Sequence, residues 1–163
     1  MINYREMRPG DAAAVHGLID ALQASGGHGR SPITPEDLER DFVKVIVAES
    51  GEDSNKIVGY LMYYFTITSR AGVSLFVEDI YVMDAMRGQR VGHELITRVA
   101  VIARRANCAA IALEANANNV RAIKFYETIG FRATHEYEDG ADVWRCYKLT
   151  RSALDEFLMR NAN

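Results

Sequence analysis

The segment MRGQRVGHELI, residues 86–96, joins two glycines and two arginines to the start of a helical pattern. The first backbone N–H groups of a helix have no internal partners and together carry about half a positive charge. Glycine lets the backbone approach a ligand closely, and arginine suits phosphate oxygens. The combination predicts a site for a phosphate or diphosphate group. The spacing of Gly88 and Gly92 fits neither the Walker A nor the Rossmann pattern, so an ordinary strand–helix turn is the alternative.

Two acidic neighbours and one tyrosine are the candidates for proton transfer. Glu78 and Asp79 belong to the strand pattern that leads to this loop, and strand alternation places their side chains on opposite faces of a sheet. One of the two is therefore available to a substrate, unless both merely pair with arginines or cap loops. Tyr126 lies on the apolar side of a predicted helix, a position that by itself favours a core tyrosine.

The elements that must position these residues follow from hydrophobic periodicity. Helical spacing predicts a first helix over 11–23 with Asp11 as its cap, and Thr34-Pro35 begins a short helix that ends near Phe42. Asn119 caps a later helix, and Gly130 ends it. The other predicted elements are strands at 44–50, 56–68, 73–83, 109–115, 131–137 and 142–149, and helices at 91–106, 119–129 and 151–160, the last capped by Thr150.

This order predicts a mixed α/β (α+β) domain around one mostly antiparallel sheet with flanking helices. The stretches GEDSN (51–55) and EDGAD (138–142) are typical of hairpin turns. A chain of 163 residues fits one domain, which we place at 1–163.

Composition argues against several classes of protein. A net charge of −3 is unfavourable for a general binder of nucleic acids or membrane surfaces. No apolar run approaches the roughly 20 residues that span a bilayer, and the N-terminus has no signal-peptide pattern. Cys108 and Cys146 predict two reduced thiols in a cytoplasmic protein. The four histidines have no metal-ligand spacing, so we expect no metal.

A second motif, NVRAIKFYETIGF at 119–131, lies one strand beyond the glycine turn. Together with VEDIYVMDAMRGQRVG, it resembles the GNAT superfamily of acetyl-CoA-dependent N-acetyltransferases. The loop of that family reads Q/R-x-x-G-x-G/A, and its later signature is N-x-x-A-x-x-F/L-Y. The stretches IVGYLMYYFT, LFVEDIYVM and RRANC are similar to the spermidine/spermine (diamine) N-acetyltransferase branch. The resemblance implies a single GNAT-like domain and transfer of acetyl from acetyl-CoA to a primary amine.

The resemblance also implies a role for each matching residue. Tyr126 is the general acid toward the departing thiolate, and Glu78 is a base that acts through water or positions the amine. Asp79 and Tyr64 are expected near the amine, since one or two rings of the cluster at 60–65 suit an ammonium group. The residues implied in cofactor binding are Ile80, Tyr81, Val82, Arg87, Gly88, Gln89, Arg90, Val91, Gly92, Asn119 and Tyr126.

Two features depart from the pattern of these relatives. Arg90 stands where the family has glycine, and an arginine suits the loop if its φ is negative. The stretch ASGGHGRSPIT, 24–34, lacks the acids of the diamine branch, which favours a small primary amine, amino acid or related metabolite over spermine-like substrates. The alternatives are acetylation of a protein, peptide or aminoglycoside, and a non-catalytic acyl-CoA-binding module. The family also implies a homodimer.

Overall fold

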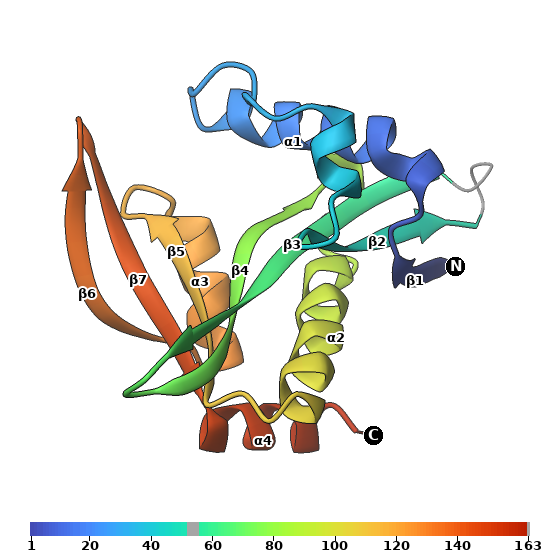
Figure 1. Cartoon of the computed structure of the whole chain (residues 1–163). Helices are drawn as coiled ribbons and strands as arrows, with labels where there is room; N and C mark the ends of the chain where they lie inside the picture. Colours follow the sequence, from blue (N-terminus) through green and yellow to red (C-terminus); the bar gives the residue numbers. More distant parts are fainter. Residues whose placement is uncertain (52–55, 163) are drawn as a thin grey trace. The chain divides into compact units, whose positions relative to one another are not determined.

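The computed structural model describes residues 1–51 and 56–162, in which strands and helices alternate along the chain (Figure 1). The strands are β1 (Ile2–Glu6), β2 (Lys44–Ser50), β3 (Lys56–Thr68), β4 (Gly72–Val82), β5 (Ala110–Asn116), β6 (Arg132–Asp139) and β7 (Asp142–Thr150). The α-helices are α1 (Ala12–Ser25), α2 (Val91–Arg105), α3 (Val120–Ile129) and α4 (Arg151–Arg160), and the 3-10 helices are η1 (Pro9–Asp11), η2 (Pro35–Glu39) and η3 (Asp84–Met86).

The strands form a mixed sheet in the order β1-β2-β3-β4-β5-β7-β6. β4 and β5 pair in parallel, while β1–β2, β2–β3, β5–β7 and β6–β7 pair antiparallel. The predicted α/β class and the predicted strands and helices are confirmed, with ends that shift by a few residues. The one strand that the sequence did not predict is β1, whose mixed polar and apolar residues are fixed by pairing with β2, from Ile2 opposite Ser50 to Glu6 opposite Ile46.

Three details of the predicted elements are wrong. The helix expected to end near Phe42 is a 3-10 helix that ends at Glu39. Asp11 does not cap α1 with its side chain, because its carboxylate binds Arg5 and the backbone N–H of Arg8 instead. Thr150 precedes α4 but makes no side-chain cap bond. The predicted turn at 51–55 lies, apart from its first residue, outside the described residues.

The structure comprises two compact units: residues 1–64 with 79–96, and residues 65–78 with 97 to the C-terminus. The unit boundaries fall inside β3, β4 and α2. In the first unit α1 packs on the sheet, and Val15 and Ile19 of the helix share a fully buried cluster with Val47 and Tyr60. This arrangement follows from the helical spacing of the apolar residues of α1 and the alternation of β2.

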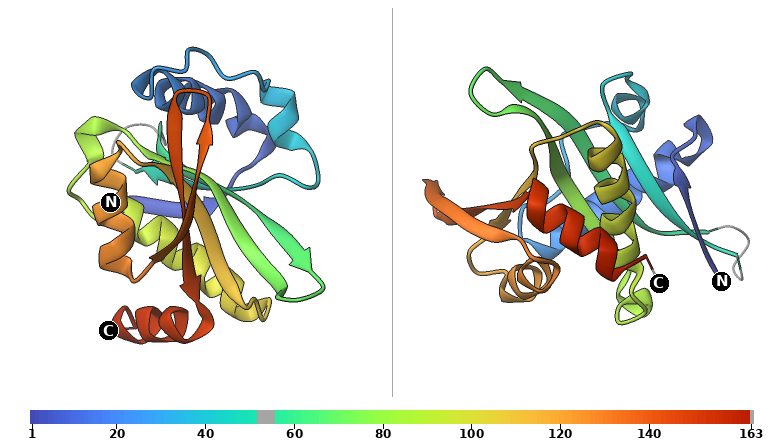
Figure 2. Two further views of the ribbon diagram at one scale, coloured as in Figure 1. Left: turned by 90° about the vertical axis from the view of Figure 1, so that its left-hand side faces the viewer. Right: turned by 90° about the horizontal axis from the view of Figure 1, so that it is seen from below.

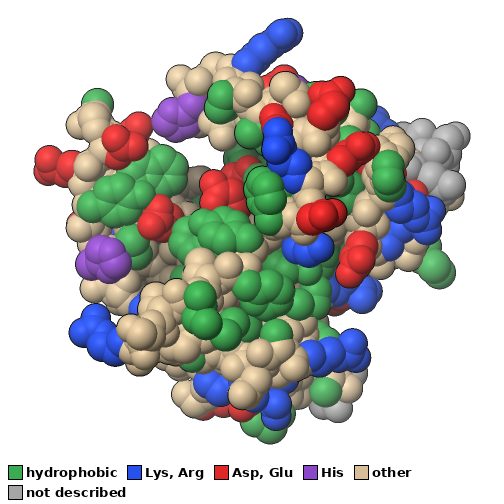
Figure 3. Space-filling view, viewed as in Figure 1, with side chains coloured by type: hydrophobic (Ala, Val, Ile, Leu, Met, Phe, Trp, Pro, Cys, Tyr) green, Lys and Arg blue, Asp and Glu red, His purple; other side chains and the backbone are tan. Residues whose placement is uncertain are grey.

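An ion-pair network ties the start of the first unit together. Arg5 Nη1 lies 2.6 Å from Asp11 Oδ2, and Arg5 Nη2 lies 2.7 Å from Glu49 Oε1. All three side chains are largely buried, at 12–15% exposure. Acidic and basic side chains are interspersed over the β1 and η2 region of this unit (Figure 3).

In the second unit, α4 packs against β5 and β7 (Figure 2), and its Leu154 and Phe157 are buried. β6 and β7 run antiparallel as one long hairpin, and every residue of β6 is exposed. Cys108 and Cys146 are both free and buried, which confirms the predicted pair of thiols.

Candidate active site

Segment 80–92 lies in the first unit and runs from the end of β4 through η3 into α2. Its central side chain is Arg87, which makes three contacts. Nε donates to the carbonyl oxygen of Val82 at 3.1 Å, Nη1 lies 2.5 Å from Asp84 Oδ1, and the guanidinium lies 5.8 Å from the ring centroid of Tyr81. Arg87 therefore fastens the loop to the end of the strand from which it departs.

Two residues of the turn have positive φ. Gly88 has φ +79° with nothing near the place where a Cβ would stand, and Arg90 has φ +61°. The negative φ that would suit an arginine in this loop is not found at Arg90, because the chain turns from extended backbone at Arg87 into α2 within three residues. A non-glycine residue in this region costs about 1 kcal/mol. The carbonyl oxygen of Arg90 accepts the N–H of Glu94 at 3.0 Å, so Arg90 is the N-cap residue of α2.

The neighbouring loop residues complete this turn. Gln89 Nε2 donates to the carbonyl oxygen of Ala85 at 3.3 Å. Val91 is buried and begins α2, and Gly92 occupies its first turn. The first unit therefore contains all of the loop residues that the sequence implied in cofactor binding.

The end of β4 lies close to β3 in the same unit. The N–H of Met83 donates to the carbonyl oxygen of Val58 at 2.9 Å. A Cβ on Gly59 would stand 2.9 Å from the carbonyl oxygen of Tyr81, closer than real Cβ contacts allow. Glycine is therefore required at position 59 for this spacing of the two strands.

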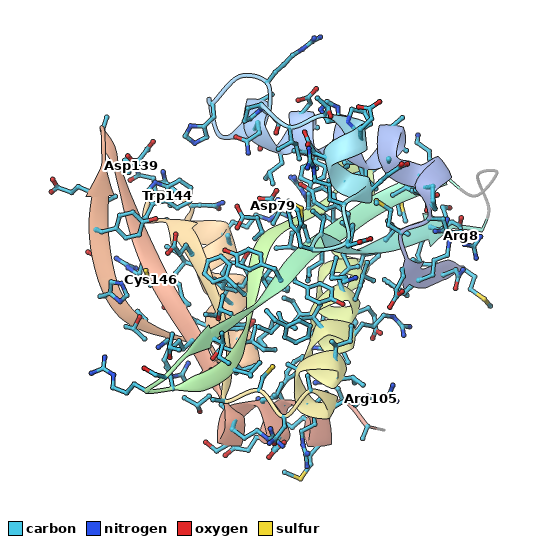
Figure 4. The ribbon with its side chains drawn as sticks, in the orientation of Figure 1. Arg8, Asp79, Arg105, Asp139, Trp144 and Cys146 are labelled. Atoms are coloured by element: carbon cyan, nitrogen blue, oxygen red, sulfur yellow. The ribbon has the colours of Figure 1, made fainter. Side chains whose placement is uncertain are left out.

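Glu78 and Asp79 differ in surroundings, as strand alternation predicts. The hydroxyl of Tyr60, which is fully buried, donates to Asp79 Oδ2 at 3.3 Å, and Asp79 itself is half-buried on β4 (Figure 4). Glu78 is exposed and belongs to the second unit. Of the two carboxylates, Asp79 is thus held by a core tyrosine.

The aromatic cluster of β3 divides into two kinds of ring. Tyr60 and Tyr63 belong to the core, whereas Tyr64 and Phe65 are exposed at 38% and 45%. Burial and the nearby charge of Glu6 raise the pKa of Tyr63. Tyr64, the ring predicted near the amine, is thus available at the surface of the first unit.

The second unit holds Asn119 and Tyr126, at the start and near the end of α3. Asn119 Oδ1 accepts the N–H of Ala122 at 3.1 Å, which confirms the predicted cap. Gly130, at φ +122°, ends the helix, as predicted. It turns the chain so that the N–H of Phe131 donates to the carbonyl oxygen of Tyr126 at 3.1 Å.

The ring of Tyr126 is 7% exposed and is held by other aromatic rings of the same unit. Its centroid lies 5.5 Å from Phe125, 5.8 Å from Phe131 and 6.4 Å from Tyr147. The Phe131 ring meets it edge-on, a favourable geometry for aromatic pairs. The sequence motifs did not identify Tyr147 as a neighbour of Tyr126. The alternation of buried and exposed side chains along β7 indicates only that Tyr147 is buried.

His93, in the first turn of α2, has a pKa that its surroundings shift. Burial lowers its pKa, the charge of Arg90 lowers it further, and Glu94 opposes them. His93 is therefore neutral at pH 7.

Among residues 1–51 and 56–162, no three His, Cys, Asp or Glu side chains gather as metal ligands would. Within the same described part of the chain, no helix is long and apolar enough to cross a membrane.

The strand order, the glycine–arginine turn into α2 and the capped α3 are together those of the GNAT class of acyltransferases. The family model of the acetyltransferase (GNAT) family matches residues 16–131, and the chain belongs to this family. Its membership of this family makes the chain an acetyltransferase.

Individual relatives agree with this placement. The chain is 30% identical over 167 residues to thialysine N-epsilon-acetyltransferase of Bos taurus, which covers 95% of this chain and 96% of the relative. It is 29% identical over 154 residues to spermidine/spermine N(1)-acetyltransferase-like protein 1 of Homo sapiens, which covers 88% of this chain and 20% of the relative. A chain of the crystal structure of the NatC complex bound to Gag peptide and CoA shares the fold, with a TM-score of 0.76 and 18% identity over 91% of this chain and 98% of that one.

Proposed function

We propose that this chain transfers the acetyl group of acetyl-CoA to the primary amine of a small molecule, in one domain that spans 1–163. The similarity to thialysine N-epsilon-acetyltransferase over 95% of the chain carries this proposal. The amine that we favour is the side-chain amine of an amino acid like thialysine. The absence of acids in the sequence of 24–34 supports this choice over spermine-like substrates.

The proposed cofactor contacts follow the family motifs. The backbone of residues 80–82 pairs with the pantetheine arm, and the N–H groups of 87–92 face the diphosphate. Asn119 contacts the pantetheine while it caps α3. Each of these roles is compatible with the fixed turn at Arg87 and with the cap bond of Asn119.

The proposed chemistry is direct attack of the amine nitrogen on the thioester carbon. An alkyl amine has a pKa of about 10 and arrives protonated, so it must lose a proton before attack. Glu78 takes that proton through water, while Asp79 and Tyr64 position the ammonium end of the substrate. A backbone N–H of β4 stabilises the oxyanion. The C–S bond then breaks, Tyr126 donates its phenolic proton to the sulfur, and solvent reprotonates the phenol.

A screen of amines, read as release of the free CoA thiol, tests the proposal. We expect turnover with thialysine, lysine and short diamines, and much lower rates with spermine, an aminoglycoside and a peptide N-terminus. Preference for either of the last two would replace the proposed substrate class. A melting temperature that rises with acetyl-CoA, without thiol release for any amine, would instead indicate a non-catalytic acyl-CoA-binding module.

Replacement of Arg87 by alanine should weaken acetyl-CoA binding about tenfold, because the loop loses its ties to the strand and to η3. Calorimetric titration measures the affinity. The melting temperature should change little, since the ion pair with Asp84 is exposed. Arg70, an exposed arginine in the turn between β3 and β4, provides the matched control, and Arg70→Ala should bind like the wild type. Equal affinities for both variants would reject the role of Arg87.

We further propose that the enzyme works in the cytoplasm as a homodimer. The two buried free thiols support a reducing compartment. Members of the family often form dimers, which supports a dimer here. We expect the final strand and helix to form the contact between the two chains. Light scattering after gel filtration tests the dimer, and a monomer at micromolar concentration would contradict it.

A further inference from the structure

The second unit holds a half-buried carboxylate that has no cation as its partner. Glu114 lies on β5, where its Oε2 accepts the hydroxyl of Tyr137 at 2.6 Å and its Oε1 accepts the thiol of Cys146 at 3.5 Å. Both donors are neutral side chains. Glu114 makes no ion pair with any residue that the structure describes. A carboxylate that is partly removed from water normally pairs with a cation, and Glu114 still lacks one.

The register of the sheet places two aromatic rings on the same face as this carboxylate. Glu114 stands opposite Cys146 of β7, and Tyr137 of β6 stands opposite Trp144 of β7. Trp144 and Cys146 are two positions apart on β7 (Figure 4). Residues that stand opposite each other, or two positions apart on one strand, share a face of the sheet. Tyr137 is 40% exposed and Trp144 is half-buried, so part of each ring is open to a ligand.

A carboxylate beside aromatic rings suits an ammonium group. The two oxygens of Glu114 can accept about four hydrogen bonds, so the carboxylate keeps capacity beyond its two present donors. An ammonium group has three donors, and the face of a tryptophan ring attracts a cation. The hydrogen bond to Glu114 raises the pKa of Tyr137 to about 12, so this hydroxyl stays protonated at neutral pH and holds the carboxylate in place.

The proposed reaction leaves one charge of the acceptor to be recognised. Thialysine, lysine and short diamines each have two amino groups, and only one of them is acetylated. The other remains an ammonium group, and the sequence of 24–34 contains no acid to receive it. The second unit also contains the proposed acid, Tyr126, which lies beside Tyr147, the residue that follows Cys146 on β7.

We propose that Glu114 binds the second ammonium group of the acceptor, beside the Trp144 ring, and so selects amines with two ammonium groups over monoamines. This inference rests on the proposed function and narrows its substrate class. Glu114 acts on substrate binding and not on the reacting atoms, so its loss should raise the KM and leave the rate at saturating amine unchanged. The hydroxyl of Tyr137 only orients Glu114 and is dispensable under the same saturating conditions.

Two amines of equal length test this selectivity. In 1,5-diaminopentane the two ammonium groups have the spacing that they have in lysine, and n-pentylamine lacks one of them. We expect the wild type to have a KM about tenfold lower for the diamine than for the monoamine, read as thiol release. Glu114→Gln keeps an oxygen that can accept from Tyr137 but removes the charge. It should raise the KM for the diamine about tenfold and change the KM for the monoamine by less than about twofold.

Glu138→Gln is the matched control, because it removes one exposed carboxylate from β6 of the same unit. This variant should prefer the diamine as strongly as the wild type does. The inference would be overturned if Glu114→Gln kept the preference for the diamine. An equal rise of both KM values would overturn it too, since that result indicates damage to the site and not loss of one ionic contact.

The emission of Trp144, the single tryptophan of the chain, reports on this face without turnover. With free CoA present, 1,5-diaminopentane should change the emission of the wild type, and Glu114→Gln should need about tenfold more diamine for half of the change. A wild-type emission that does not respond to the diamine would contradict the inference. Absence of thiol release with every amine would instead contradict the proposed function, and the fluorescence titration distinguishes the two failures.

Discussion

The Tyr126→Phe variant should release thiol about 100-fold more slowly than the wild type at saturating acetyl-CoA and amine. Loss of a general acid typically costs that much or more, because the thiolate must then leave without a proton. Binding of acetyl-CoA should be unchanged, since the phenylalanine ring keeps the contacts with Phe131 and Tyr147. Initial rates of thiol release, combined with calorimetric affinities, measure the two effects separately.

Tyr137→Phe is the matched control for this experiment. Tyr137 lies in the same unit, and its hydroxyl donates to Glu114 Oε2 at 2.6 Å, which raises the pKa of Tyr137 to about 12. Loss of that exposed hydroxyl should leave the rate within about twofold. If Tyr126→Phe also stayed within twofold of wild type, Tyr126 would not be the acid.

The Arg5→Met variant should lower the free energy of unfolding at pH 7 by about 3 kcal/mol. The substitution leaves the carboxylates of Asp11 and Glu49 without their cation, and breaking a largely buried ion pair has a cost of this order. Urea unfolding followed by circular dichroism measures the change. Lys44→Met, which removes an exposed cation from β2, should change stability by less than about 0.5 kcal/mol.

The effect of Arg5→Met should also depend on pH. Hydrogen bonds from Arg5 lower the pKa values of Asp11 and Glu49 below their ordinary values of 3.8 and 4.5. The stabilisation is therefore complete above about pH 5 and is lost as the pH falls through the lowered pKa values. The difference between wild type and variant should shrink toward pH 3. A difference that is constant from pH 7 to pH 3 would contradict this explanation.

Local features of this fold could be predicted because neighbouring residues determine them. Asn119 and Gly130 stand directly at the two ends of α3, so the local sequence is enough to predict where that helix begins and ends. The strands are rich in β-branched residues, which favour extended backbone. The candidate loop was recognisable for the same reason, since its glycines and arginines are contiguous in the sequence.

Features that depend on distant partners could not be predicted. Asp11 is a good helix cap in isolation, yet its carboxylate binds Arg5 of β1, which also pairs with Glu49 of β2. The strand β1 exists because β2 offers it a partner. The ring of Tyr147 is brought beside Tyr126 by the pairing of β7 and the packing of α3, and neither residue carries a local signal of the other.

The backbone angle at Arg90 could not be predicted for another reason. Residue preference favours negative φ for arginine, and this preference is outweighed by the geometry of a short turn from strand to helix. The side-chain contacts of Arg87 depend on that same turn. The ion pair with Asp84 could have been predicted from the sequence, because the two residues are three positions apart.

Because Gly59 has no side chain, the backbones of β3 and β4 can lie close together at this point. Any larger residue at position 59 would push against the carbonyl oxygen of Tyr81 and move the two strands apart. The displaced residues would be those that we propose to pair with the pantetheine arm. A substitution at Gly59, which is not among the proposed cofactor contacts, would then appear first as weaker acetyl-CoA binding.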